Sequence, residues 1–260
     1  MVRIIITGVR GKMGSTIFNL ALKYEHIIVT GVTETGNHPY IGKTLESRAG
    51  ILTIEDELQK VIEKSDVIID FTEPSASLEH FRLARTYKKA VVIGTTGFNE
   101  ESMAEIKSAS GIRAVVSPNM SVGMNLMFDI VEKLSRIMKD DYDIEIMEMH
   151  HRLKKDAPSG TAMRLKDIVE SSHPERSWIE IFGRKGITGE RKREELGVLS
   201  LRGGDVVGEH TVLFAGVGER LEITHRAYSR ENFARGALIA AQWIVNQRDG
   251  IYTMKDVLGL

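Results

Sequence analysis

The sequence predicts an α/β protein in which a doubly wound parallel sheet is followed by an α+β domain with a mixed, mostly antiparallel sheet. Two observations lead to this fold class. Over residues 2–116, short β-branched and apolar runs alternate with segments of helical periodicity, which is the pattern of βαβ units. Over residues 178–225, strand-like runs follow one another with glycine-rich turns and little helix between them. The first pattern indicates parallel strands, and the second indicates mixed or antiparallel pairing.

The alternation of strand and helix begins at the N-terminus. Residues 2–7 form a β-branched run that stops at Gly8, and Ile17, Leu20 and Ala21 then recur with helical spacing. The same criteria predict further strands at residues 27–32, 67–71, 91–93 and 114–116, and helices at residues 15–23, 55–63, 76–87 and 100–109. Each helix then forms the crossover between two parallel strands.

The pattern changes after residues 117–119. Helices are predicted at residues 124–138 and from about Ser159, and strands at residues 142–149, 178–182, 198–201, 210–215 and 221–225. The last segment, residues 233–245, is an alanine-rich helix of the kind found in the first half. We therefore expect a first domain of residues 1–121, to which residues 231–260 return, and a second domain of residues 122–230.

Composition and charge limit the classes of partner. The chain has 260 residues, of which 42% are hydrophobic, so it can build one large core or two modest ones. With 35 basic and 36 acidic side chains the net charge is −1, and we expect no binding to nucleic acid or membranes. The sequence has no cysteine, which excludes disulfides and thiolate catalysis and fits a reducing compartment. Because the N-terminal apolar run is too short for a signal peptide, we expect a cytoplasmic protein.

A glycine loop follows the predicted first strand. Gly8, Gly11 and Gly14 have the spacing G-x-x-G-x-x-G, a variant of the fingerprint of dinucleotide-binding folds. An ordinary tight turn between strand and helix would also use glycines here. The position favours a cofactor, because the backbone can approach a pyrophosphate at the helix N-terminus. Glu34 ends the second strand, where an acid accepts hydrogen bonds from an adenine ribose, and we therefore expect a Rossmann-type domain.

Other loops are expected at the same edge of the parallel sheet. Residues 70–72, 94–98 and 117–123 follow three predicted strands, and the carboxyl ends of parallel strands form the ligand-binding edge of a doubly wound sheet. Glycine and threonine also favour turns, so each loop taken singly has a structural explanation. Lys12 either solvates the glycine loop or pairs with a cofactor phosphate.

The segment 148–162, called here the histidine–lysine motif, concentrates groups that suit proton transfer to a small anion. It contains His150 and His151, Lys154 and Lys155, and a Ser-Gly-Thr turn that opens a predicted helix. Histidine can transfer a proton near neutral pH, and lysine supplies a fixed cation. The turn offers backbone N–H groups to an anion.

A metal site is the alternative reading of the same motif. Glu148, His150 and His151 are acceptable zinc ligands. Adjacent histidines on a strand point to opposite faces, however, and Lys154 and Lys155 would repel a cation. We therefore expect no metal. A solvated charged loop is the structural explanation for the two lysines, and we keep it for Lys155.

The sequence closely resembles the dihydrodipicolinate reductase family from end to end. The segments that carry the resemblance are Glu148-Met149-His150-His151 with Lys154 and Asp156, Pro158-Ser159-Gly160-Thr161-Ala162, the glycine loop with Met13-Gly14, Gly94-Thr95-Thr96-Gly97, Ser117-Pro118-Asn119, and residues 202–211.

The resemblance implies an enzyme of the diaminopimelate route to lysine, which transfers a hydride from NADH or NADPH to a small cyclic dicarboxylate derived from 4-hydroxy-tetrahydrodipicolinate. By motif position it makes His150 and Lys154 the catalytic, proton-handling residues. It assigns a substrate carboxylate to His151, Ser159, Gly160 and Thr161. It assigns the cofactor to Gly8, Val9, Arg10, Gly11, Lys12, Met13, Glu34, Gly94, Thr95, Thr96, Ser117, Pro118, Asn119 and Met120. The family also implies a homotetramer, with residues 122–230 binding the substrate and forming the subunit contacts.

One departure from the family bears on the choice of cofactor. Some members place an arginine directly after the ribose-binding acid, where it can pair with the 2′-phosphate of NADP. Here Thr35 follows Glu34. We therefore expect NADH to be used at least as well as NADPH, although Arg10, Lys12 or Lys43 could supply a charge.

Two other functions share part of this pattern. Another two-domain dehydrogenase of an amino or keto acid would share the glycine loop but not the motif from His150 to Thr161. A nucleotide-sensing binding protein without catalysis would predict the loss of Lys154, which is present.

Overall fold

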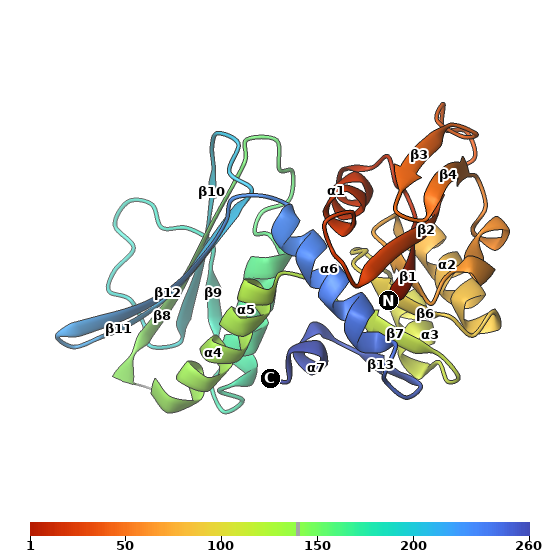
Figure 1. Ribbon diagram of the computed structural model, residues 1–260. Helices are drawn as coiled ribbons and strands as arrows, with labels where there is room; N and C mark the ends of the chain where they lie inside the picture. The colour runs from red at the N-terminus through yellow and green to blue at the C-terminus, as the bar shows by residue number, and fades with distance from the viewer. Residues whose placement is uncertain (139–140) are drawn as a thin grey trace. The chain divides into compact units, whose positions relative to one another are not determined.

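A computed structural model describes residues 1–138 and 141–260 of the chain (Figure 1). Contacts between Cα atoms divide the chain into two compact units. The first unit comprises Met1–Val122 and Arg230–Leu260, and the second unit comprises Gly123–Ser229. Each unit has its own sheet and its own apolar core.

The first unit is built on an eight-stranded sheet. Its strands are β1 (Val2–Ile6), β2 (Ile27–Thr33), β3 (Thr44–Ser47), β4 (Gly50–Glu55), β5 (Val67–Asp70), β6 (Ala90–Ile93), β7 (Arg113–Val116) and β13 (Gly250–Tyr252). They lie in the order β13-β7-β6-β5-β1-β2-β4-β3, with all pairs parallel except β3 and β4. The strand order reverses at β1, so the ends of β1 and β5 form the switch point where doubly wound sheets bind ligands.

Helices cover both faces of this sheet. They are α1 (Lys12–Ala21), α2 (Pro74–Thr86), α3 (Glu100–Ser108), α6 (Glu231–Ile244) and α7 (Met254–Leu258). In β1, Ile4 and Ile6 belong to one core cluster with α1 and α6, whereas Ile5 belongs to a second cluster with α2 and α3. This alternation is the period of two that a strand imposes on its side chains. The predicted doubly wound parallel sheet is therefore confirmed.

The helix predicted at residues 55–63 is wrong. Residue 55 ends β4, and the chain then forms two single 3₁₀ turns, η1 (Leu58–Lys60) and η2 (Ile62–Lys64). Leu58, Val61 and Ile62 are all buried, and their spacing led to the prediction of a helix. Two tight turns bury the same three side chains, because 3₁₀ and α geometry place residues i and i+3 on one side. The short strands β3, β4 and β13 and helix α7 were not predicted.

The second unit is built on a five-stranded mixed sheet. Its strands are β8 (Asp143–His150), β9 (Ile179–Ile181), β10 (Glu195–Arg202), β11 (Gly208–Gly216) and β12 (Glu219–Ala227), in the order β12-β11-β8-β10-β9. The antiparallel pairings of β11 with β12 and with β8 are the longest, and the pairs with β10 are parallel. The predicted mixed, mostly antiparallel sheet is confirmed.

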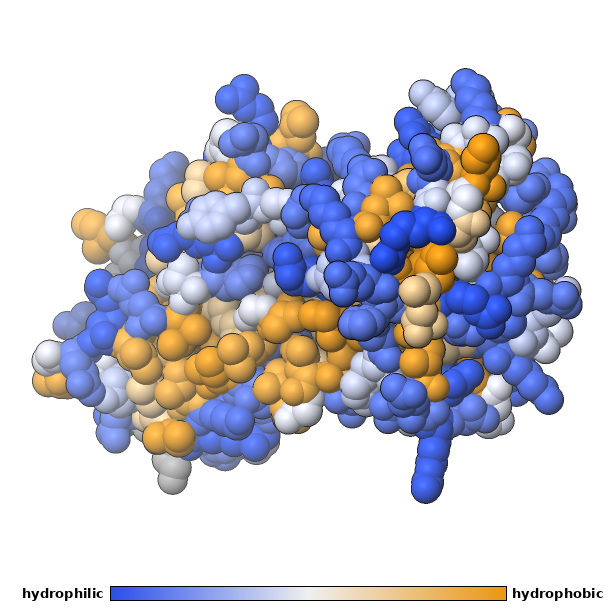
Figure 2. All heavy atoms as spheres, viewed as in Figure 1, coloured by the Kyte–Doolittle hydropathy of each residue, from blue (hydrophilic) through white to orange (hydrophobic). Residues whose placement is uncertain are grey.

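Two helices, α4 (Val122–Met138) and α5 (Gly160–Ser171), pack on one face of this sheet. The buried apolar residues of β8 on that face are Ile144 and Ile146, which share a cluster with apolar side chains of both helices. The opposite face carries half-exposed apolar side chains, among them Leu201. On the face of the molecule drawn in Figure 2, apolar side chains also gather over α4. Within the described residues, no helix is long and apolar enough to cross a membrane.

Candidate active site

The glycine loop has the geometry of a close backbone approach. Gly8 follows β1 with φ = +61°, a conformation that favours glycine, and α1 begins at Lys12 after Gly11. A Cβ at Gly14 would lie 2.0 Å from the carbonyl oxygen of Gly8, so the helix contacts the loop backbone and tolerates no side chain there. The first turn of α1 presents N–H groups that have no partner within the helix, which is the usual site for a phosphate.

Glu34 lies beside the glycine loop, as the sequence predicted for a ribose-binding acid. It follows β2, and its two carboxylate oxygens accept hydrogen bonds from the backbone N–H groups of Arg10 (2.8 Å) and Thr35 (3.0 Å). The Arg10 guanidinium lies 4.1 Å from the centroid of the Tyr40 ring, and the Lys43 ammonium lies 4.4 Å from it. Two cations therefore share one aromatic ring in the neighbourhood of Glu34.

Two more predicted cofactor loops lie at this carboxyl edge. A Cβ at Gly94 would lie 2.1 Å from the Phe71 ring, so the turn after β6 packs directly against the turn after β5. After β7, the Ser117 hydroxyl donates to the carbonyl oxygen of Asn119 (2.9 Å), and the carbonyl oxygen of Met120 packs against α6. The loops that were predicted to lie at one edge of the parallel sheet therefore do lie at the same edge.

A buried carboxylate–histidine pair joins the end of β5 to α2, and its histidine was not among the predicted site residues. The Asp70 side chain is completely buried and accepts hydrogen bonds from Thr72 N (2.9 Å), Thr72 Oγ1 (2.7 Å) and Thr95 Oγ1 (3.2 Å). Its other oxygen contacts Nδ1 of His80 on α2. Burial alone would raise the pKa of Asp70, but the hydrogen bond from His80 and the neighbouring donors outweigh it and lower the pKa. Asp70 is therefore a charged link between two of the loops.

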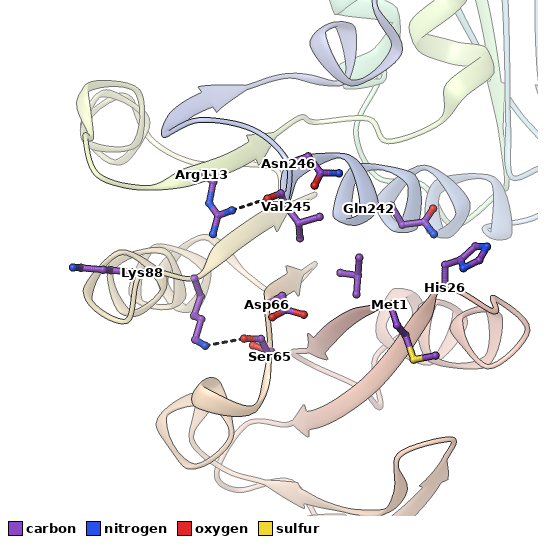
Figure 3. Close-up of a pocket in the computed structure, with 11 residues that line it drawn as sticks. Met1, His26, Ser65, Asp66, Lys88, Arg113, Gln242, Val245 and Asn246 are labelled. Atoms are coloured by element: carbon purple, nitrogen blue, oxygen red, sulfur yellow. Dashed lines mark hydrogen bonds between the residues drawn. The ribbon is translucent and has the colours of Figure 1, made fainter.

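These features fit a nicotinamide dinucleotide. Gly8, Gly11 and Gly14 leave the backbone open to a pyrophosphate, and Glu34 offers carboxylate oxygens to a ribose. A cavity of about 630 Å³ lies at the opposite edge of the sheet (Figure 3). Its lining includes Arg113 at the start of β7, so it is remote from the glycine loop and is not the predicted cofactor site.

In the second unit, the histidine–lysine motif begins on β8. Glu148 and His150 are two residues apart on the same strand, so both side chains point to the face that α4 and α5 cover. The Nδ1 atom of His150 lies 2.6 Å from Oε2 of Glu148. His151 follows the end of the strand, where its N–H donates to the carbonyl oxygen of Val206 (2.8 Å). His150 is therefore the last residue of β8, and His151 lies just beyond the strand.

Glu148 is the side chain of the motif on which several hydrogen bonds converge. It is fully buried and accepts two hydrogen bonds from the Arg202 guanidinium, each 2.9 Å long. Its Oε1 atom also accepts from the backbone N–H of Ser159 (3.2 Å). Burial alone would raise the pKa of Glu148, but the hydrogen bonds from Arg202 and His150 outweigh it and lower the pKa to about 2. The carboxylate therefore stays ionised throughout the physiological range.

The imidazole of His150 is close to a second buried histidine. Burial lowers the pKa of His150, and the nearby charges of Lys154 and Arg202 add to this effect while Glu148 opposes it. The His210 ring packs edge-on against the His150 ring, with centroids 5.2 Å apart. Burial lowers the pKa of His210 to about 3, so it is neutral, and its Nε2 lies 3.1 Å from the hydroxyl oxygen of Ser159.

Lys154 and the Ser-Gly-Thr turn complete the motif. The Lys154 ammonium lies 2.9 Å from Oδ2 of Asp156, and the Lys154 side chain is 21% exposed. Ser159 caps α5, because its hydroxyl accepts from the N–H of Ala162 (3.2 Å). A Cβ at Gly160 would meet no atom within 4 Å, so the space above this helix N-terminus is open. Ser159, Gly160 and Thr161 thus form an open helix N-terminus of the kind that binds anions.

No group of three or more histidine, aspartate or glutamate side chains that could hold a metal ion occurs in residues 1–138 and 141–260. Of the three residues weighed as zinc ligands, Glu148, His150 and His151, Glu148 already forms an ion pair with the Arg202 guanidinium. The Nδ1 atom of His151 is buried and has no hydrogen-bond partner among the described residues.

Arg202 and His210 join the motif through the pairing of β10 and β11 with β8. Arg202 is brought next to His150 by the register of β10 against β8, and His210 is brought next to Glu148 by the register of β11. Neither register is readable from one chain, because it depends on pairing across many residues. The sequence does show that Glu148 and His150 are two residues apart on a predicted strand, which places their side chains on the same face.

Comparisons with known proteins agree with this description. A model of the C-terminus of dihydrodipicolinate reductase matches residues 123–258, and a model of its N-terminus matches residues 2–120. The 4-hydroxy-tetrahydrodipicolinate reductase of Syntrophus aciditrophicus is 48% identical over 265 residues, covering 100% of this chain and 99% of the relative. The enzyme of the same name from Methanocaldococcus jannaschii is 46% identical over 271 residues, covering 100% of this chain and 98% of the relative.

A solved structure extends the likeness to the fold. Dihydrodipicolinate reductase from Paenisporosarcina sp. TG-14 with bound dipicolinate is 26% identical, has a TM-score of 0.79, and is matched over 99% of this chain and 100% of that chain. The scyllo-inositol dehydrogenase of Lactobacillus casei, with a TM-score of 0.59 at 15% identity over 99% of this chain and 93% of that chain, shares the fold. The chain belongs to the dihydrodipicolinate reductase family, whose oxidoreductases reduce 4-hydroxy-tetrahydrodipicolinate in lysine biosynthesis.

Proposed function

We propose that this protein reduces 4-hydroxy-tetrahydrodipicolinate to tetrahydrodipicolinate, with the nicotinamide dinucleotide on the first unit and the cyclic dicarboxylate on the second. The observation that carries this proposal is the hydrogen-bonded arrangement of the histidine–lysine motif. Through Glu148, His150 is connected to the turn that opens α5, and Lys154 lies close enough for its charge to lower the pKa of His150. A proton-transfer group, a cation and an anion-binding turn thus lie together in one unit.

On the second unit, the open N-terminus of α5 holds a substrate carboxylate through the N–H groups of Gly160 and Thr161 and the Ser159 hydroxyl, since the Ser159 N–H is donated to Glu148. The His151 imidazole contributes a further contact. The dicarboxylate bound to the Paenisporosarcina relative is of the same chemical class. The 4-hydroxyl group leaves as water, which gives a conjugated double bond in the ring, and hydride addition to it moves electrons towards the ring nitrogen or an enamine carbon of the substrate. The ammonium of Lys154 stabilises that charge, and His150 or Lys154 delivers the proton that completes the reduction.

On the first unit, a reduced nicotinamide supplies the hydride when it is bound. The residues proposed to hold this cofactor are Gly8, Val9, Arg10, Gly11, Lys12, Met13, Glu34, Gly94, Thr95, Thr96, Ser117, Pro118, Asn119 and Met120. Gly14 allows α1 to pack directly on the Gly8 carbonyl, which keeps the N-terminus of the helix next to the glycine loop.

An activity assay tests the proposal. The substrate is generated in the cuvette by condensation of pyruvate with aspartate semialdehyde on an aldolase, and the loss of NADH absorbance is followed. We expect oxidation that requires both the aldolase product and this protein. A folded sample that binds NADH but does not oxidise it in the presence of the aldolase product would instead indicate a nucleotide-sensing protein.

We also propose that NADH is used at least as well as NADPH. Both oxygens of Glu34 accept hydrogen bonds at the ribose end of the predicted site, and a carboxylate there repels a 2′-phosphate. Arg10 and Lys43 on the Tyr40 ring are the cations that could offset this repulsion. Steady-state kcat/KM measured with NADH and with NADPH tests this preference, and a large preference for NADPH in the unmodified protein would refute the proposal.

The variants Arg10→Ala and Lys43→Ala test whether these two cations account for the activity with NADPH.

We further propose a cytoplasmic homotetramer. The face of the second sheet opposite α4 and α5 bears Met147, Met149, Leu199, Leu201 and Leu213. An apolar sheet face that its own helices leave uncovered is suited to subunit contacts.

A further inference from the structure

We infer that Glu148, held by Arg202, is a positioning residue that fixes the proton of neutral His150 on Nδ1 and so makes Nε2 the nitrogen that exchanges the proton with the substrate. The inference rests on the proposed function for the role of His150, and it assigns a role to Glu148 and Arg202 that the motif alone does not give.

The first step concerns the hydrogen-bond capacity of the carboxylate. Oε1 accepts from Arg202 Nη2 (2.9 Å) and from the Ser159 N–H (3.2 Å). Oε2 accepts from Arg202 Nη1 (2.9 Å) and lies 2.6 Å from Nδ1 of His150. An ionised carboxylate is an acceptor only. The contact with His150 is therefore satisfied only if Nδ1 carries a proton.

The second step concerns the other ring nitrogen. With the proton on Nδ1, neutral His150 presents an unprotonated Nε2, and an added proton must go there. Gly208 lies beside this atom, and a Cβ at Gly208 would lie 3.1 Å from Nε2, closer than most side chains tolerate. Glycine at this position therefore keeps the side of Nε2 that faces β11 free of a side chain at residue 208.

The third step concerns how firmly the carboxylate is held. The Glu148 side chain is fully buried, and the paired bonds from the planar guanidinium define its orientation as well as its charge. Arg202 also donates to the carbonyl oxygen of Asp156 (2.6 Å), next to the ion pair of Asp156 with Lys154. The same two side chains thus orient His150, the substrate turn at Ser159 and the segment that carries Lys154.

The charge of Glu148 also matters when His150 is protonated. An imidazolium at His150 is disfavoured by burial and by the cations Lys154 and Arg202, and Glu148 is the group that opposes them. The arrangement corresponds to the buried aspartate that orients the histidine of a serine protease triad and stabilises its charged form.

Glu148→Gln is the decisive variant. Two donors face the Oε1 position, so the glutamine oxygen is best placed there, which turns its NH₂ group towards Nδ1 of His150. His150 then has to accept at Nδ1 and carry its proton on Nε2. We expect kcat to fall by roughly ten- to a hundredfold, because the proton-transfer group is present in the wrong tautomer. The KM for NADH should not change, since the cofactor residues belong to the other unit.

The matched control is Glu145→Gln. Glu145 lies on the same strand but points to the opposite face, where it pairs with Arg184 and Arg191. This variant also loses a carboxylate that is engaged with arginine, so it reports on a purely structural role. We expect it to lose stability while kcat and the His150 tautomer stay as in the unmodified protein.

The test combines ¹⁵N NMR of the histidine rings with steady-state kinetics. The ring shifts, assigned with a His150→Gln sample, distinguish the two neutral tautomers without any substrate. We expect Nδ1–H in the unmodified protein and Nε2–H in Glu148→Gln. A proton on Nε2 in the unmodified protein overturns the inference, even if the variant does not fold. A folded Glu148→Gln with unchanged kcat and Nδ1–H also overturns it. Absence of substrate-dependent NADH oxidation would refute the proposed function instead, and the tautomer measurement would remain valid.

Discussion

The two lysines of the histidine–lysine motif differ in their surroundings. Lys154 is partly buried, forms an ion pair with Asp156, and acts electrostatically on His150. Lys155 is exposed. The resemblance to the family implied the role of Lys154, and the contacts of Lys154 give this assignment a physical basis.

At the residue scale, we expect Lys154→Ala to lower kcat/KM by roughly a hundredfold to ten-thousandfold, because the substrate loses a cation that stabilises the developing charge. The dissociation constant for NADH, measured by fluorescence titration, should be unchanged. Lys155→Ala is the matched control, and its kinetics should equal those of the unmodified protein. Equal losses in the two variants would contradict the assignment.

A second prediction at this scale concerns acid stability. The folded-state pKa of Glu148 is about 2, against an ordinary value of 4.5, so its contribution is fully present above pH 4.5 and is lost as the pH falls towards 2. For a fully buried, paired carboxylate this contribution is on the order of a few kcal/mol. We expect the free energy of unfolding to decline over this window in the unmodified protein and to decline less in Glu148→Gln. Chemical denaturation at a series of pH values measures both curves, and parallel curves would show that another group causes the decline.

At the element scale, strands and helices were predictable where the apolar period was unambiguous. β1, β5, β6 and β7 are short and buried, and their β-branched runs identified them. The segment around residues 55–63 was misread because its buried positions fit either a helix or two 3₁₀ turns. β3 has two exposed residues and one buried residue, so its sequence carries little periodic signal.

The close contact between α1 and the glycine loop leads to a prediction about this element. Gly14→Ala places a Cβ 2.0 Å from the carbonyl oxygen of Gly8, so the loop has to move. We expect the dissociation constant for NADH to rise by roughly tenfold or more, equivalent to about 1.4 kcal/mol. Gly183→Ala, where a Cβ meets no atom within 4 Å, is the control. Calorimetric titration of the two folded variants with NADH compares them, and equal affinities would show that the loop backbone does not contact the cofactor.

At the scale of the whole molecule, the uncovered face of the second sheet leads to a prediction about assembly. Leu201 lies on this face and is 50% exposed in the single chain. We expect the unmodified protein to be a tetramer, and Leu201→Lys to shift it to smaller species, because a buried subunit contact does not accommodate an unpaired ammonium. Light scattering coupled to size-exclusion chromatography gives the mass. Ile51→Lys, which changes an exposed apolar residue of the first unit, should leave the mass unchanged.

The sequence by itself determined the fold class, the edge of the sheet that holds the cofactor loops, and the motif proposed for the substrate. These depend on short-range patterns, namely the period of apolar residues and the spacing of glycines, histidines and lysines along one segment. Only the tertiary structure decided that Arg202, Ser159 and His150 converge on Glu148, and that His80 pairs with Asp70. Arg202 and Glu148 lie on different strands, and Ser159 and His80 lie at or on helices, so these contacts exist only once strand register and helix packing are set.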